Sequence, residues 1–301
     1  MTRTEDSAIR RAGRRRAAMA GTVVVALFAG SATLLTAHDF WLVPDAFAVT
    51  PGGRIELRGQ TSSLFPSSLS AVTPDRIISA RVVTANSTVT VRDVSVQGQS
   101  LRLAHAAATA GQHLIGVQLA PRTVRESPAS FRRYLDLEGA PEARQRYERE
   151  GLLPPVGGDS IVRRYAKYAK TVVEVGDGPR AFQRPLNHPL EFVPLSDPSA
   201  IRVGDTLRVR LVLLGKPAVS TYLHAGSVPS GPSARTDTAA ARRAAARDVK
   251  LETDASGVAT VVVTQSGLWN VRTLQIVPAD KGSGADWDVH WATLVFSVPR
   301  R

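Results

Sequence analysis

The first part of the chain alternates short apolar runs with turn residues. Between Phe40 and Leu119 each run has the length of one strand, and several runs alternate apolar with polar positions, as half-buried β-strands do. The runs are Ile55–Leu57, Ile77–Val83, Val89–Val96 and His113–Leu119. Glycine, proline and asparagine mark the turns between them. This spacing predicts an all-β sandwich.

The segment 127–151 departs from this pattern and predicts two short helices. Phe131, Tyr134 and Leu135 recur at helical spacing, and Pro128 suits the first turn of a helix. Glycine and proline near position 140 end the first helix and allow a second one to begin. We therefore expect a helical insertion in an otherwise β-rich chain.

Strand-like alternation returns at 160–175. Tyr165 and Tyr168 alternate there with Lys167 and Lys170. Lysines are frequent on edge strands because their charge discourages edge-to-edge pairing with other chains. We therefore expect this strand to lie at a solvated edge.

A second series of strands follows residue 198. The predicted strands are 206–214, 218–224, 249–252, 258–264, 268–276 and 290–298, and the stretch 236–247 is expected to be a surface insertion. Glycine-containing turns between them supply the positive φ angles of tight hairpins. We predict a mostly β protein with two immunoglobulin-like β-sandwich domains and a short helical insertion between them. The predicted limits are 1–37 for a signal peptide, 38–180 for the N-terminal domain, 181–198 for a connector and 199–301 for the C-terminal domain.

Composition narrows the classes of function. The 301 residues include no cysteine, which excludes disulfides, thiolate metal sites and cysteine nucleophiles. The net charge of +12 would suit a polyanion, but the arginines are scattered, and no zinc-finger spacing or aromatic RNA-binding signature accompanies them. We expect a solvated basic surface and no nucleic-acid partner. Four tryptophans could line a sugar-binding platform, but we expect them in the core.

The N-terminus has the pattern of an export signal. Arginines between Arg10 and Arg16 precede an uncharged apolar stretch, 17–37, that is rich in small residues towards its end. We expect cleavage after Ala37 and a periplasmic protein that begins at His38; the competing cleavage site is after Ala32. A retained leader that anchors the protein in the inner membrane is the alternative, since about 20 apolar residues can span a bilayer. Only in that case do we expect membrane contact.

Several segments resemble one bacterial family. AHDFWLVPDAF at 37–47 and ADWDVHWATLVF at 285–296 are the most specific, and SFRRYLDLEG, NHPLEFVPLSDP and SGLWNVRT lie between them in the same order. They resemble periplasmic proteins grouped as domain of unknown function 4198 (DUF4198), which are associated with cobalt and nickel uptake. The resemblance implies a metal-uptake accessory role. Gln275 stands where family members often carry histidine, which removes one expected ligand.

A mature N-terminal histidine would be a metal chelator. The free amine and the imidazole of His38 can bind one nickel, cobalt or copper ion together, because both are nitrogen donors that suit these metals. Asp39 could add a carboxylate oxygen, and His290, between two tryptophans, is the candidate second histidine. The alternative is that His38 only suits signal processing. The remaining histidines are isolated in the sequence, and no HExxH spacing occurs.

Two hypotheses about function remain open. The first is a periplasmic metal-binding protein that uses His38 and meets a metal transporter or another envelope partner. The second is a non-catalytic interaction module that binds an envelope glycan or protein. We do not expect an enzyme, because the chain contains no nucleophile elbow, Walker loop or dinucleotide fingerprint.

Overall fold

The computed structural model describes residues 38–138, 140–229, 238–245 and 247–300, so the predicted signal peptide lies outside the described residues. The elements, in chain order, are β1 (Asp39–Pro44), β2 (Ala48–Val49), β3 (Arg54–Ser62), η1 (Pro74–Arg76), β4 (Ile77–Val83), β5 (Thr88–Thr90), β6 (Asp93–Gln97), β7 (Ser100–Ala106), β8 (Gly111–Leu119), β9 (Arg122–Glu126), α1 (Pro128–Leu137), α2 (Pro141–Arg149), β10 (Ile161–Val175), β11 (Leu190–Pro194), β12 (Thr206–Leu213), β13 (Lys216–Pro217), β14 (Tyr222–Val228), α3 (Thr238–Ala245), β15 (Val249–Glu252), β16 (Val258–Val262), β17 (Gly267–Pro278) and β18 (Trp287–Val298). The predicted mostly β fold is confirmed. None of the described helices has the length and apolar character needed to cross a membrane.

The strands form three sheets. The largest has the order β15-β14-β17-β18-β10-β8-β4-β5, with β2 and β9 paired to β10. A second sheet has the order β1-β3-β7-β6, and a third contains β11, β12, β13 and β16. β10 and β18 pair in parallel, whereas the other neighbours along the three sheet orders are antiparallel.

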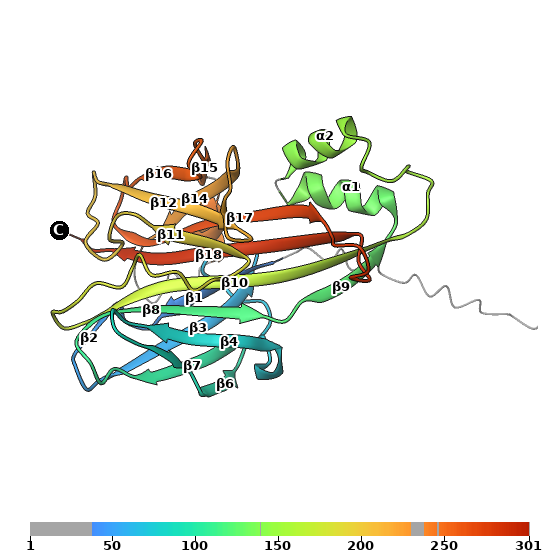
Figure 1. Cartoon of the computed structure of the whole chain (residues 1–301). Helices are drawn as coiled ribbons and strands as arrows, with labels where there is room; N and C mark the ends of the chain where they lie inside the picture. The colour runs from blue at the N-terminus through green and yellow to red at the C-terminus, as the bar shows by residue number, and fades with distance from the viewer. Residues whose placement is uncertain (1–37, 139, 230–237, 246, 301) are drawn as a thin grey trace, which may run out of the picture. The chain divides into compact units, whose positions relative to one another are not determined.

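The long strand β10 contributes to two hydrophobic cores. Ala166 and Tyr168 belong to the core that contains β11, β12 and β16, whereas Ala169 and Val173 belong to the core that contains β3 and β7. Successive side chains of a strand point to opposite faces of its sheet, so one strand can serve both sandwiches. Figure 1 shows β10 in yellow-green between these two groups of strands.

The ten-stranded sheet therefore runs through both predicted sandwich domains. The described residues, from His38 onward, belong to one compact unit. The division into domains 38–180 and 199–301 stays a prediction, and the structure adds that their main sheet is continuous. The segment 181–198 is more than a connector, because it contains β11, which pairs with β12 from Leu190 to Pro194.

The expected edge position of 160–175 is wrong. β10 is a central strand, with β18 along one side and β8 and β9 along the other. Lys167 and Lys170 are consequently buried. The local pattern could not reveal this, because the partner strand β18 lies more than 100 residues further along the chain.

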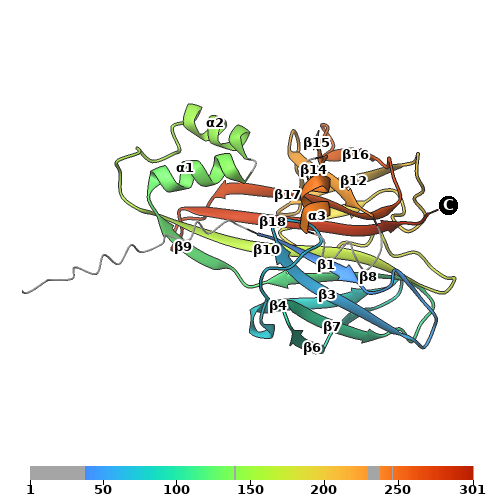
Figure 2. The ribbon, with the colours of Figure 1, turned by 180° about the vertical axis from the view of Figure 1, so that it is seen from behind.

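The helical insertion packs against β17 and β18 of the ten-stranded sheet. Ser127 caps α1, its hydroxyl oxygen accepting a hydrogen bond from the Ser130 backbone N–H at 3.2 Å. The apolar face of α1 then buries Phe131 against Trp287 of β18. This confirms the predicted helices. Viewed from behind in Figure 2, α3 lies against β14, and the two elements are in contact.

Candidate functional site

Strand β1 places the predicted mature N-terminus against the central sheet. All six residues of β1 are buried. The Thr293 hydroxyl of β18 donates to the Phe40 carbonyl oxygen at 2.6 Å, and the Lys167 ammonium of β10 donates to the His38 carbonyl oxygen. His38 itself is half-exposed. The start of β1 is therefore held in place while His38 reaches the surface.

The Asp39 side chain belongs to a buried ionic chain. Arg272 Nε lies 3.7 Å from Asp39 Oδ2, and its terminal nitrogen donates to Asp248 Oδ2 at 2.7 Å. Burial raises the pKa of both carboxyl groups, and the charge of Arg272 opposes that rise. Gly226 makes room for this arrangement, because a Cβ added there would overlap the Asp248 carboxylate. Arg272 of β17 thus links Asp39, the first residue of β1, to Asp248, which directly precedes β15.

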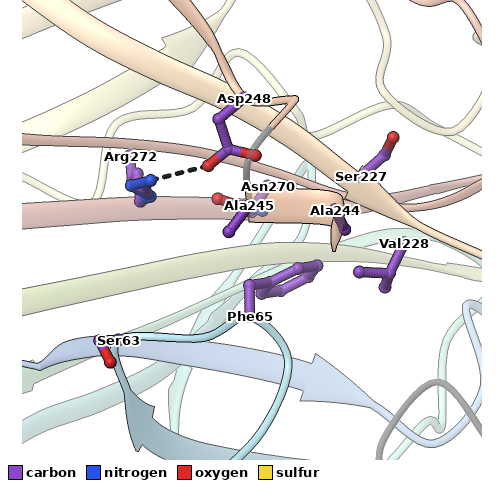
Figure 3. Close-up of a pocket in the computed structure, with 9 residues that line it drawn as sticks. All are labelled: Ser63, Phe65, Ser227, Val228, Ala244, Ala245, Asp248, Asn270 and Arg272. Atoms are coloured by element: carbon purple, nitrogen blue, oxygen red, sulfur yellow. Dashed lines mark hydrogen bonds and ion pairs between the residues drawn. The ribbon is translucent and has the colours of Figure 1, made fainter. Parts of the chain in front are cut away.

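A small cavity adjoins Asp248 and Arg272. It has a volume of about 10 Å³, room for about one water molecule. Figure 3 shows the Asp248–Arg272 ion pair on one side of it and Phe65 on another. The buried Asn270 also lines it, and its Oδ1 accepts no hydrogen bond from the described residues. The cavity is too small for an organic ligand, and its polar lining suits a water that would satisfy Asn270.

Lys167 sets the electrostatics around His38. Burial lowers the pKa of Lys167 to about 8, although Asp39 opposes the shift. Burial, followed by the charge of Lys167, lowers the pKa of His38. The His38 imidazole is therefore neutral near pH 7, which is the form that binds metals.

The structure does not bring His290 to His38 and Asp39. His290 Nδ1 lies 3.0 Å from the Tyr168 hydroxyl, whereas His38 is bound by Lys167. Tyr168 and Lys167 are neighbours on β10, so their side chains point to opposite faces of the sheet. His290 lies on one face and the start of β1 on the other. Burial also lowers the pKa of His290.

The predicted ligands fit a metal ion only in part. The described residues contain no group of three or more histidine, aspartate or glutamate side chains that could hold an ion. Asp39 is buried beside Arg272, and His290 lies on the other face. His38 is the predicted ligand that keeps suitable exposure and protonation, and its second donor would be its own amine after cleavage.

The tryptophans form no exposed platform. Trp41, Trp269, Trp287 and Trp291 are all buried, as predicted for core residues. Sequence reasoning missed Lys167, Arg272 and Asp248. The length of the 160–175 alternation was the one available signal for Lys167, because a strand of 15 residues is long for a sheet edge. Nothing in the sequence connects Arg272 with Asp248 or Asp39.

Comparisons with solved structures show only distant likeness. The ectodomain of mouse nectin-like molecule 4 is 12% identical and the match covers 87% of this chain and 64% of that chain, with a TM-score of 0.18. The adhesin InvE of Yersinia pseudotuberculosis is 13% identical over 87% of this chain and 59% of that chain, with a TM-score of 0.19. A fragment of alpha-2-macroglobulin from Escherichia coli is 10% identical over 85% and 69%, with a TM-score of 0.20.

The present chain spans less than two thirds of the nectin-like and InvE structures. Superposition at this level carries no inference about function. No curated protein matches the chain. The family model of a domain of unknown function matches residues 35–276, which is most of the chain, and the protein therefore belongs to the DUF4198 family.

Proposed function

We propose that the protein is exported to the periplasm and binds a nickel, cobalt or copper ion through the amine and imidazole of a mature N-terminal His38. The observation that supports this most is the anchoring of β1. Lys167 binds the His38 carbonyl oxygen, and Asp39 is buried directly behind it. A new N-terminus at this point would be fixed in position, so little conformational entropy would be lost on chelation.

The residues around His38 predict that metal binding there is weak and reversible. The free amine has an ordinary pKa of about 7.7–8.0, so it loses its proton near neutrality at little cost. The positive charge of Lys167 beside His38 disfavours a cation there. Two nitrogen donors beside the positive charge of Lys167 would bind a metal ion weakly. Weak binding suits a protein that passes the ion on to a transporter or another envelope partner. We propose this role without catalysis.

The experiment begins with the exported protein. Intact mass and N-terminal sequencing establish the mature start, and titration with Ni²⁺, Co²⁺ and Cu²⁺ then measures binding. We expect one equivalent in the wild type, at least tenfold weaker binding in His38→Ala, and wild-type binding in the control His224→Ala. The mass of each variant confirms the same cleavage. A mature start elsewhere, or His38→Ala binding as the wild type does, refutes the proposal.

A second candidate is the non-catalytic interaction module. A partly open cavity of about 600 Å³ supports it, lined by the loop 151–155 after α2 and the loop 278–287 that joins β17 to β18. Leu152 is exposed beside it. Retention of the metal-free protein on envelope glycan or on one envelope protein, with loss on Leu152→Asp, would favour this candidate.

A further inference from the structure

Two histidine rings lie close together in the N-terminal sandwich. His105 lies near the end of β7 and His113 near the start of β8, and their ring centroids are 6.0 Å apart. β7 and β8 belong to different sheets. Leu103, two residues before His105, and Ile115, two residues after His113, belong to the core between these sheets. The two imidazoles therefore continue the inward-facing rows of that core.

A polar nitrogen of this pair has no partner. His113 is only 1% exposed, and its Nδ1 makes no hydrogen bond with the described residues. Buried polar atoms are nearly always satisfied, so an exception calls for an explanation. Burial lowers the pKa of both imidazoles, and in His113 the neighbouring His105 adds to that effect. Both rings are therefore neutral near pH 7 and offer a nitrogen lone pair.

We infer that His105 and His113 bind a single copper(I) ion between their rings. Two-coordinate copper(I) holds its ligands in a line. A metal–nitrogen distance of about 2 Å, with each nitrogen about 1 Å from its ring centre, places the two centroids about 6 Å apart. The observed 6.0 Å separation matches this value. The 59° angle between the ring planes is no obstacle, because rings on a linear axis can rotate about it.

The surroundings favour a monovalent ion. No third histidine, aspartate or glutamate completes a metal-binding group with this pair in the described part of the chain. The cost of burying an ion rises steeply with its charge, so two neutral imidazoles compensate a single charge better than a double one. Zn²⁺ and Ni²⁺ also require more ligands than the pair supplies. His105 is half-buried, so entry is from its side.

This site is independent of the proposed role of His38, because the two share no residue. The test uses the exported protein under anaerobic conditions, with copper(I) in competition with the chromophoric chelator bicinchoninate. His105→Ala is the main variant, because a half-buried position near a strand end tolerates truncation. His224→Ala, also a half-buried strand histidine, is the matched control. His38→Ala separates the two sites.

We expect His105→Ala to weaken copper(I) binding at least 100-fold at this site, while His224→Ala and His38→Ala keep it. X-ray absorption of the copper-loaded His38→Ala protein should show two nitrogen ligands. The inference is overturned if His105→Ala retains wild-type copper(I) binding, or if the wild type binds none. Tighter binding of Zn²⁺ than of copper(I) also overturns it. Loss of binding in His38→Ala alone would support the proposed function and refute this inference.

Discussion

The buried ion pair between Lys170 and Glu191 gives the sharpest test of how β11 is held against the central strand β10. The Lys170 ammonium of β10 donates to Glu191 Oε1 and to the Phe192 carbonyl oxygen of β11, the latter at 2.7 Å. Both side chains are only 3% exposed. Glu191 Oε1 also accepts from the Leu186 backbone N–H at 2.7 Å. Burial lowers the pKa of Lys170, and the charge of Glu191 opposes that shift, so the Lys170 ammonium depends on Glu191.

Glu191→Gln leaves the Lys170 ammonium buried without its countercharge. Breaking a buried pair in this way costs about 3–5 kcal/mol of unfolding free energy. With a urea dependence of roughly 2–3 kcal/mol per molar, the unfolding midpoint should fall by about 1–2.5 M. Four buried tryptophans report the transition by fluorescence. The double variant Lys170→Met with Glu191→Leu removes both charges and should lose much less stability than Glu191→Gln.

The exposed pair Lys250–Glu142 is the control, with both side chains about 40% exposed. Glu142→Gln should change the unfolding free energy by less than about 1 kcal/mol, because water screens such pairs. Two results would refute the reasoning. One is a Glu191→Gln protein within 1 kcal/mol of the wild type. The other is a double variant that is as unstable as Glu191→Gln.

Two further predictions concern buried groups elsewhere. Burial lowers the pKa of His188 to about 4 from 6.5, so unfolding takes up a proton between these values and stability falls as pH falls through this range. His188 should account for a loss of roughly 3 kcal/mol of unfolding free energy between pH 7 and pH 4. Urea unfolding of His188→Gln should lack this loss, and an equal pH dependence of stability in the variant and the wild type would contradict the prediction. Gly226→Ala should cost about 1–3 kcal/mol by displacing the Asp248 carboxylate, yet should cost little in an Asp248→Ala background. Thermal unfolding of the wild type, the two single variants and the double variant measures both costs. An equal loss of stability on Gly226→Ala with and without Asp248 would exclude the overlap with the Asp248 carboxylate as the cause.

Local patterns were sufficient to predict individual elements. The predicted strands 77–83 and 249–252 coincide with β4 and β15, and the helices within 127–151 correspond to α1 and α2. Alternation, helical spacing, caps and turn residues act over a few residues, so they are visible in sequence. The same holds for the core position of the tryptophans, because large aromatic side chains gain most from burial.

The candidate site could be predicted only in part. The sequence suggested His38 and Asp39, and the structure leaves His38 half-exposed while it buries the Asp39 side chain beside Arg272. It also selected His290, which the structure places on the other face of the sheet. The position of a residue along its strand decides which face of the sheet its side chain takes. The sequence could not fix the face of His290 relative to β1, because β1 belongs to a different sheet from β18 and β10.

Local sequence patterns were enough to predict the β-rich class, the helical insertion and the family, and they suggested histidines as candidate metal ligands. Long-range strand pairing places β10 at the centre of its sheet, buries Lys167 and Lys170, and brings His105 next to His113. The physical reason is the range of the interactions. A strand's own residues set its periodicity, whereas its burial and the partners of its charges depend on strands far away in the chain, such as β18, which pairs with β10.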